Sequence, residues 1–119
     1  MNKRHSNELY KDLRTALLVA SDNVYLRSAP KTKTFPYIVF DIFPIYEGEK
    51  CSIDLWGMKG TEEAFENLAD TVEALLDGYI IANQYHTVML MTNDDRSWVR
   101  DEDENIIRIR MSFNGIYQS

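Results

Sequence analysis

The segment from residue 61 to 77 carries apolar and acidic residues at the spacing of an α-helix, and it constrains the fold of this 119-residue chain more than any other. Thr61 suits the N-cap, Glu62 and Glu63 follow at the positive end of the helix dipole, and Gly78 suits the position after the last turn. Such an amphipathic helix must bury its apolar stripe against another element. The stripe consists of Ala64, Phe65, Leu68, Ala69, Val72, Leu75 and Leu76.

Two segments with a period of two residues provide a surface for this helix. In Cys51–Trp56, the odd-numbered residues are apolar and are predicted to face inward. In Asn105–Gly115, the odd positions from Ile107 to Phe113 are predicted to face inward and Arg108, Arg110, Ser112 and Asn114 outward. Further strands are predicted at 35–43, 79–82 and 85–92, and an earlier helix, capped by Ser6 or Asn7, has its apolar stripe at Leu9, Leu13, Ala16, Leu17 and Ala20.

These elements predict an α+β fold in which two helices pack on one face of a mostly antiparallel sheet of four to five strands, in the order α-β-β-α-β-β. The length predicts a single domain over residues 1–119. The strand at 35–43 is apolar on both faces, which predicts a central position between two covering layers. Residues 44–50 are predicted to form a turn-rich connection. The expected core includes Phe65, Leu68, Val72, Ile53 and Ile109.

The cysteine content and the apolar runs indicate the compartment. Cys51 is the only cysteine, so no internal disulfide is possible, and this favours a reducing environment. The basic first residues are not followed by the apolar stretch of a secretory signal, and no apolar run approaches the length of a membrane span. We therefore expect a soluble cytoplasmic protein.

The net charge of −6 is concentrated in one element. Six of the 19 acidic residues lie in 61–77, which contains no Lys or Arg, and the remaining 13 equal the 13 basic residues of the chain. Residues 1–34 are basic, with seven Lys or Arg against three acids. This polarity suits ordered packing against charged neighbours, although a solvated acidic helix face explains it equally simply.

No set of residues predicts catalysis, a cofactor or a metal ion. Cys51 lies on the inward phase of its strand, and the two histidines, His5 and His86, are not placed to act as its base, so an inert buried thiol is expected. The segment from Asp101 to Ser112 has candidate ligands at its first, third and fifth positions, but it fails the calcium-loop pattern, because Ile106 stands in place of the glycine and Ser112 in place of the final glutamate. The chain has neither zinc-ligand spacing nor a glycine-rich phosphate loop. We expect no enzymatic activity.

Protein interfaces are the remaining class of site. Trp56 on the polar phase of its strand and Trp98 in a polar hairpin end are candidates, because exposed indoles favour interfaces. Arg108 and Arg110 project from one strand face toward a phosphate or carboxylate. The acidic helix face adds Glu66, Asp70 and Glu73.

The order of these segments from Leu9 to Phe113 resembles a divergent family of phage tail-completion, or tail-terminator, proteins. The resemblance rests on Leu9-Tyr10-Lys11-Asp12-Leu13, on Phe35-Pro36-Tyr37-Ile38-Val39, on Leu55-Trp56-Gly57 followed at once by the amphipathic helix, and on the late hairpin. The turn of that hairpin, Arg100-Asp101-Glu102-Asp103, is similar to the family's Arg-Asp-x-Asp turn, which makes Arg100 a further interface candidate. Glu102 and Glu104 stand where the family often has Pro or Gly, and the connection at 44–50 is short for the family.

The resemblance implies a structural virion protein of a phage or prophage. Its subunits would form a ring, typically sixfold, at the head-proximal end of the tail, contact the tail tube protein and the head-completion or connector protein, stop tube growth and join tail to head. It would assemble in the host cytoplasm, and duplex DNA would pass through without specific binding, since an acidic wall repels it.

Two other classes stay open. The acids of the second helix are equally typical of a host-takeover or DNA-mimic protein that binds a basic partner, which predicts a salt-sensitive complex. A small enzyme or ligand-binding domain that uses Cys51 predicts rapid alkylation of this thiol.

Overall fold

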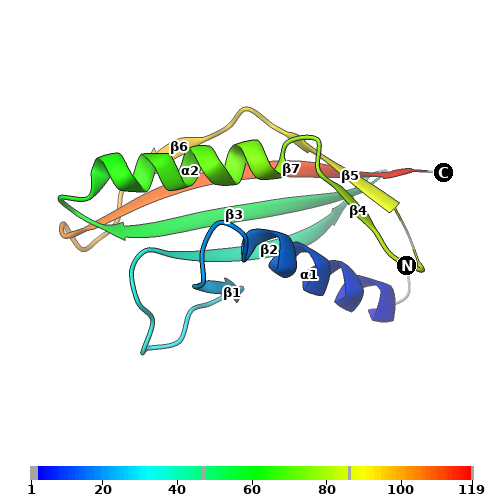
Figure 1. Cartoon of the computed structure of the whole chain (residues 1–119), viewed down its shortest axis with the longest axis horizontal. Coiled ribbons are helices and arrows are strands. Elements are labelled where there is room, and N and C mark those ends of the chain that lie inside the picture. The colour runs from blue at the N-terminus through cyan, green and yellow to red at the C-terminus, as the bar shows by residue number, and fades with distance from the viewer. Residues whose placement is uncertain (1–2, 47, 86, 119) are drawn as a thin grey trace.

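The computed structural model describes residues 3–46, 48–85 and 87–118, with the side chains of residues 3–7 left out. Two helices, α1 (Lys3–Leu17) and α2 (Glu62–Leu76), pack on a seven-stranded sheet (Figure 1). The strands are β1 (Val24–Leu26), β2 (Tyr37–Ile45), β3 (Gly48–Met58), β4 (Ile80–Ala82), β5 (Thr87–Thr92), β6 (Ser97–Val99) and β7 (Ile106–Gln118).

The α+β prediction is confirmed, but the predicted number and order of strands were wrong. The sheet runs β1-β2-β3-β7-β5-β4, and β6 pairs with β7 beyond the end of β5. β1 pairs with β2 in parallel, whereas all other pairs are antiparallel. The strands beyond the five predicted are β1 and β6, which have three residues each, too short for an alternation to decide between strand and loop in the sequence.

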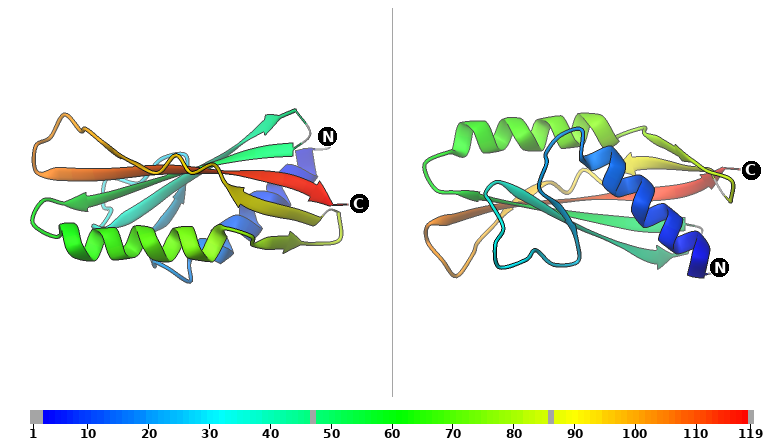
Figure 2. Two further views of the ribbon diagram at one scale, coloured as in Figure 1. Left: turned by 90° about the horizontal axis from the view of Figure 1, so that it is seen from above. Right: turned by 60° about the horizontal axis from the view of Figure 1, so that its bottom comes forward.

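The predicted loop at 44–50 is instead the tight end of a hairpin. Ile45 pairs with Gly48, so only residues 46 and 47 separate β2 from β3. The Pro44 ring is tolerated in β2 because its nitrogen lies on the outer edge, where no ladder donor is needed. β2 also lacks the two covering layers that its apolar sequence predicted, because both helices lie on one side of the sheet (Figure 2).

The helix-side face of the sheet carries the core, and the strand faces assigned from the sequence are confirmed. Ile53 and Leu55 of β3 and Ile109 and Met111 of β7 are buried there with Phe65, Ala69, Val72 and Leu76 of α2. Leu68 is only partly buried at the margin of this core. Burial of each large side chain stabilises the fold by about 1.5–3 kcal/mol.

A glycine lets α2 approach the sheet closely. A Cβ atom at Gly57 would lie 2.6 Å from Cδ1 of Phe65, which is well inside van der Waals contact. Gly57 therefore continues β3 under the first turns of α2, whereas the strand predicted from the sequence ended at Trp56. Gly78 has a φ of 81° and follows the helix as predicted.

The predicted helix caps are confirmed only in part, since Thr61 occupies the N-cap position of α2 but does not cap it with its side chain. The Thr61 hydroxyl makes no cap hydrogen bond to α2 and instead donates to the carbonyl oxygen of Met58 at 2.7 Å. The Glu62 carboxylate accepts from the backbone N–H of Gly60. α1 begins at Lys3, ahead of the predicted caps Ser6 and Asn7. No helix in the described part of the chain is long and apolar enough to cross a membrane.

Candidate interaction surfaces

The face of the sheet opposite the helices, which we call the open face, carries a stack of aromatic and cationic side chains at one end. Tyr37 of β2 and Trp56 of β3 are cross-strand partners whose rings stack 5.2 Å apart with an interplanar angle of 6°. The guanidinium carbon of Arg108 lies 4.3 Å from the centroid of the Trp56 ring. Burial raises the pKa of Tyr37, and the negative charge of Asp101 adds to that rise. Trp56 is thus covered on both ring faces and only partly exposed.

The two arginines of β7 find their carboxylate within the chain. Nε of Arg110 donates to Oδ1 of Asp54 at 2.8 Å, and Nη2 of Arg108 lies 3.6 Å from the same oxygen. Nη1 of Arg108 lies 3.9 Å from Asp101. The prediction of two exposed arginines is wrong for Arg108, whose side chain is 17% exposed. Arg110 remains half-exposed, so of the two it is the one that a partner can still reach.

The acidic face of α2 is partly neutralised by the segment between β5 and β6. Nη1 of Arg96 lies 2.6 Å from Asp70 and 3.6 Å from Glu73, and its Nη2 donates to the backbone oxygen of Glu66. Helix and segment enclose an open groove of about 430 Å³ whose lining includes these residues, Asp94 and Trp98. Glu66 is exposed and has no ion pair among the described residues. This groove corresponds to the predicted acidic surface, and Arg96 is the basic residue among those that line it.

Hydrogen bonds fix the segment that forms this groove. Asp95 accepts from the backbone N–H and the hydroxyl of Ser112, and the Asn93 amide donates to the same hydroxyl at 2.8 Å. These bonds occupy the edge of β7 between the stretches paired with β5 and β6. They also bury Ser112, although its strand face is the open one. The break in the long hairpin therefore has a defined conformation, which carries Arg96 to α2.

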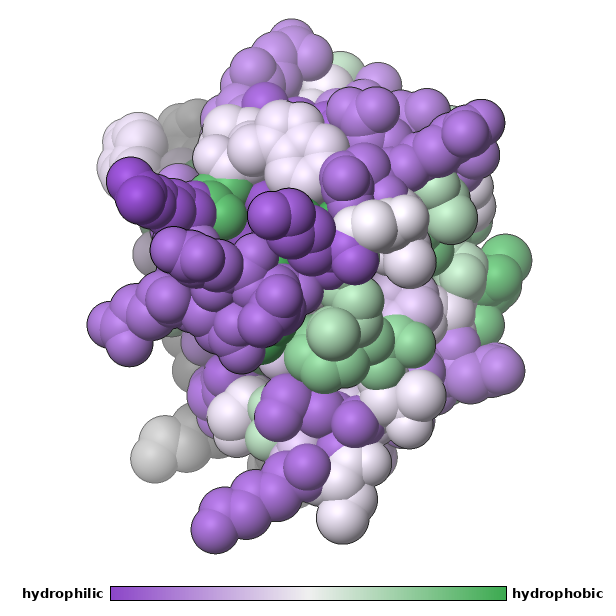
Figure 3. All heavy atoms as spheres, turned by 90° about the vertical axis from the view of Figure 1, so that its left-hand side faces the viewer, coloured by the Kyte–Doolittle hydropathy of each residue, from purple (hydrophilic) through white to green (hydrophobic). Residues whose placement is uncertain are grey.

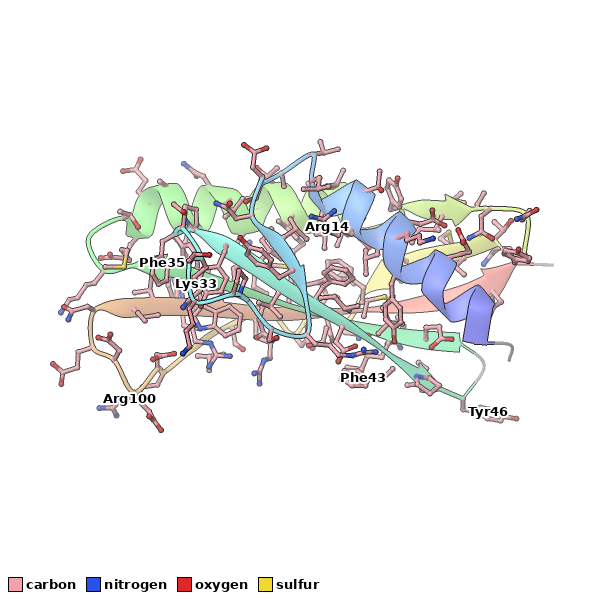
Figure 4. The ribbon with its side chains drawn as sticks, turned by 90° about the horizontal axis from the view of Figure 1, so that it is seen from below. Arg14, Lys33, Phe35, Phe43, Tyr46 and Arg100 are labelled. Carbon is pink, nitrogen blue, oxygen red and sulfur yellow. The ribbon has the colours of Figure 1, made fainter. Side chains whose placement is uncertain are left out.

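Trp98 and Arg100 come from the far end of this hairpin. The Trp98 ring lies 5.9 Å from that of Phe65 and remains half-exposed, so it covers part of α2 and still presents surface. Arg100 is exposed, projects from the hairpin end in Figure 4 and has no ion pair among the described residues. In the turn that follows, Asp101 accepts from the N–H of Asp103, and Asp103 from that of Asn105. These carboxylates organise the turn.

Cys51 lies in the core, as its strand phase predicted. Burial raises the pKa of its thiol to about 12, with a smaller contribution from the negative charge of Glu49. Glu49 is itself buried and accepts a hydrogen bond from the Tyr117 hydroxyl at 2.8 Å. His86 and the side chain of His5 lie outside the described residues. Within the described residues, no group of His, Cys, Asp and Glu could hold a metal ion.

The structure also exposes apolar residues that the sequence analysis did not select. Phe43 and Ile45 of β2 and Ile116 of β7 lie on the open face near the β2–β3 turn, and Tyr46 in that turn is 92% exposed. The signal was present, since Phe43 and Ile45 continue the phase of Tyr37 and Val39. It was missed because the strand at 35–43 was expected to be covered on both faces and residues 44–50 were taken as a loop, which has no faces to assign.

Comparison with known proteins identifies a likeness of fold. No protein-family model matches this chain, and no curated protein matches it in sequence. Among solved structures, the chain is similar to a component of the virion of a native gene transfer agent particle. The two share 16% sequence identity and superpose with a TM-score of 0.66 over 92% of this chain and 91% of the other. Nearly the whole chain therefore has a fold that also occurs in a virion component.

Proposed function

We propose that this chain is a structural virion protein that completes the tail of a phage or a phage-like particle. The observation that carries the proposal is the superposition of nearly the whole chain on a virion component. The succession of segments that resembles tail-completion proteins gives the finer assignment. In this role, a ring of subunits caps the head-proximal end of the tail tube, stops its growth and offers a docking face to the head connector.

The charges of the molecule suit this role. The exposed acids of α2, with Glu66 at their centre, form a surface that repels duplex DNA and can meet a basic neighbour. Among the predicted interface residues outside α2, Trp98, Arg100 and Arg110 remain exposed. We assign the chain no catalytic role, because its buried thiol is held in the unreactive protonated form.

The DNA-mimic alternative fits the acidic groove less well. A mimic presents a row of uncompensated carboxylates, whereas Arg96 pairs with Asp70 and Glu73 in the middle of this row. Capture of a basic host protein in a salt-sensitive complex, together with normal particles in a deletion strain, would favour the mimic over the virion component.

Deletion of the gene tests the proposal. Electron microscopy of the resulting lysate should show DNA-filled heads and separate tails, some of them overlong, because tube growth is uncapped and docking is lost. Purified protein added back should appear at one end of the tails and restore joining. Normal infectious particles from the deletion would refute the proposal.

A charge reversal tests the role of α2. Glu66→Lys should impair capping and leave the fold intact, since this side chain has no ion pair among the described residues. Glu73→Lys would be a less specific test, because the new lysine would lie beside Arg96, whose Nη1 is 3.6 Å from the native Glu73 carboxylate. Thr15→Lys, on the exposed side of α1, is the matched control. Full capping by the Glu66→Lys protein would exclude this part of α2 from the interface.

A further inference from the structure

The two signs of charge are segregated along the chain and across the molecule. Residues 60–95 contain eight acids and no Lys or Arg, whereas residues 23–40 contain three bases and no Asp or Glu. The acidic stretch includes α2, and the basic stretch includes the loop between β1 and β2. Figure 1 shows this loop along the lower long side of the molecule and α2 along the upper one. Figure 3, a view of one end with the same side uppermost, shows mostly hydrophilic side chains at both of these sides and an apolar patch between them.

The acidic side is hollowed by adjoining grooves, which we together call the acidic groove. One is the groove of about 430 Å³ described above, and the other has about 390 Å³ and shares Asp70, Glu73 and Asp94 with it. Of the described residues that line the acidic groove, five are acids and one, Arg96, is a base. The half-exposed Trp98 is also part of the lining, and an indole ring beside carboxylates favours a cationic side chain. The acids are Glu66, Asp70, Glu73, Asp77 and Asp94.

The opposite long side carries a projecting turn at residues 30–33, which we call the basic turn. The N–H of Lys33 donates to the carbonyl oxygen of Pro30 at 3.2 Å, which places Lys31 and Thr32 at the corner of the turn. Lys31 is exposed, and Lys33 is partly exposed with its Nζ 5.8 Å from the centroid of the Tyr37 ring. Neither lysine has an ion pair within the part of the chain that the structure describes. Figure 4, which looks at this side, shows Lys33 in the loop.

The acids outside the basic turn are mostly engaged by other bases. Oδ1 of Asp41 in β2 lies 3.3 Å from Nε of Arg27. Asp22, which precedes β1, and Glu102 are exposed and have no ion pair among the described residues. Neither belongs to the turn, so the turn itself presents positive charge to a partner. The other acids of the β6–β7 hairpin end, Asp101, Asp103 and Glu104, share a hollow with the bases Lys59, Arg100 and Arg108.

We infer that the basic turn of one copy of this chain docks into the acidic groove of the next, with Lys31 between the groove carboxylates and the exposed face of Trp98. The turn projects and the groove is hollow, so shape and charge agree. Pairing of two turns or of two grooves would bring like charges together, which disfavours it. Because the two surfaces lie on opposite sides, the contact repeats head to tail and closes into a ring when the rotation between copies permits. This inference rests on the proposed function and names the surfaces through which the proposed ring forms.

Cysteine cross-linking tests the contact. In a Cys51→Ala background, one protein carries Thr32→Cys in the basic turn and another carries Ala74→Cys, an exposed position in the lining of the acidic groove. A bismaleimide is added at low salt and about 1 mM protein, where even a contact with a Kd of about 1 mM is populated. The mixture should give cross-linked dimers, each protein alone should not, and a chain with both substitutions should give a ladder of oligomers. Thr32→Cys paired with Thr15→Cys is the control, because Thr15 is exposed on α1 and belongs to neither surface.

Charge reversals in the chain with both cysteines test whether the pairing is the one inferred. Lys31→Glu or Glu66→Lys should each slow cross-linking about fivefold, and the two together should restore the original rate, because they recreate the pair with its signs exchanged. Circular dichroism should stay unchanged, since both side chains are exposed. Lys50→Glu, the same charge change at an exposed position of the open face, should leave the rate unaffected. Cross-linking no faster than the control, dimers of the Thr32→Cys protein alone, or single reversals that the double reversal does not rescue would each overturn the inference.

The outcome can be separated from that of the proposed function. If the ladder forms but the deletion strain yields normal particles, the contact stands and the tail role falls. If purified protein caps tails while the Thr32 and Ala74 positions do not cross-link above the control, the tail role stands and this contact falls.

Discussion

The contact between Gly57 and Phe65 makes the sign of a mutational effect predictable. At an unhindered strand position, replacement of glycine by alanine stabilises a protein by about 0.5–1 kcal/mol, because glycine loses more chain entropy on folding. At Gly57, the added methyl group would lie 2.6 Å from Cδ1 and 2.9 Å from Cε1 of Phe65. The Phe65 ring is itself buried and lies against Trp98, so a shift away from the new methyl group would disturb this packing. We expect Gly57→Ala to destabilise the protein by about 1–3 kcal/mol, the usual cost of overpacking a core.

Urea unfolding followed by tryptophan fluorescence measures this effect, since Trp98 lies against Phe65. The matched background is Phe65→Leu, which lowers stability on its own but removes the ring that the new methyl group meets. In that background, Gly57→Ala should cost less by about 0.5–3 kcal/mol, the coupling expected of residues in contact. A stabilising Gly57→Ala, or an equal cost in both backgrounds, would refute the close packing of α2 on β3.

Three further predictions follow from the ion pairs and from Cys51. Asp54→Asn should destabilise the protein by about 1–3 kcal/mol, because Arg108 is mostly buried and loses its nearer carboxylate. Arg110→Ala should cost no more than about 1 kcal/mol, because Arg110 is half-exposed. Equal losses of the two variants in urea unfolding would contradict this difference. The folded pKa of Cys51, about 12, lies above its ordinary value of 9.0, so the contribution of the buried thiol to stability is complete below pH 9 and is lost as the pH rises toward 12. The unfolding free energy of Cys51→Ala should therefore fall less steeply between pH 8 and pH 11 than that of the native protein. Parallel slopes would argue against burial of the thiol. The native thiol should react with iodoacetamide at pH 8 far more slowly than in urea, and Cys51→Ser should retain the capping activity; rapid alkylation with loss of activity would instead revive the enzyme alternative.

The sequence alone determined the elements whose signals are local. The apolar stripe of α2 predicted its bounds to within a residue at the start and at the end, and the alternation in β3 and β7 predicted which side chains enter the core. Each of these patterns is set within one segment, because a face that must be buried imposes its period on consecutive residues. The burial of Cys51 followed in the same way from its phase in β3.

For the candidate sites, the sequence predicted which single residues are exposed, but not the contacts between residues that lie far apart in the chain. The exposure of Trp98, Glu66 and Arg100 agrees with their positions in polar stretches. The pairing of Arg108 with Asp54 was not predictable, because it depends on the register of β7 against β3, some fifty residues earlier in the chain. The pairing of Arg96 with α2 depends likewise on how the β5–β6 segment crosses the helix.

The exposed apolar residues near the β2–β3 turn show most clearly what only the tertiary structure decided. Phe43, Ile45 and Ile116 have apolar side chains that the sequence would place equally well in a core. They are exposed because both helices cover the opposite face of the sheet, where the larger and more continuous apolar surface lies. The periodicity of a strand determines which residues share a face, but the face that the helices cover depends on the summed apolar area of all the strands, and that sum exists only once the strands have paired.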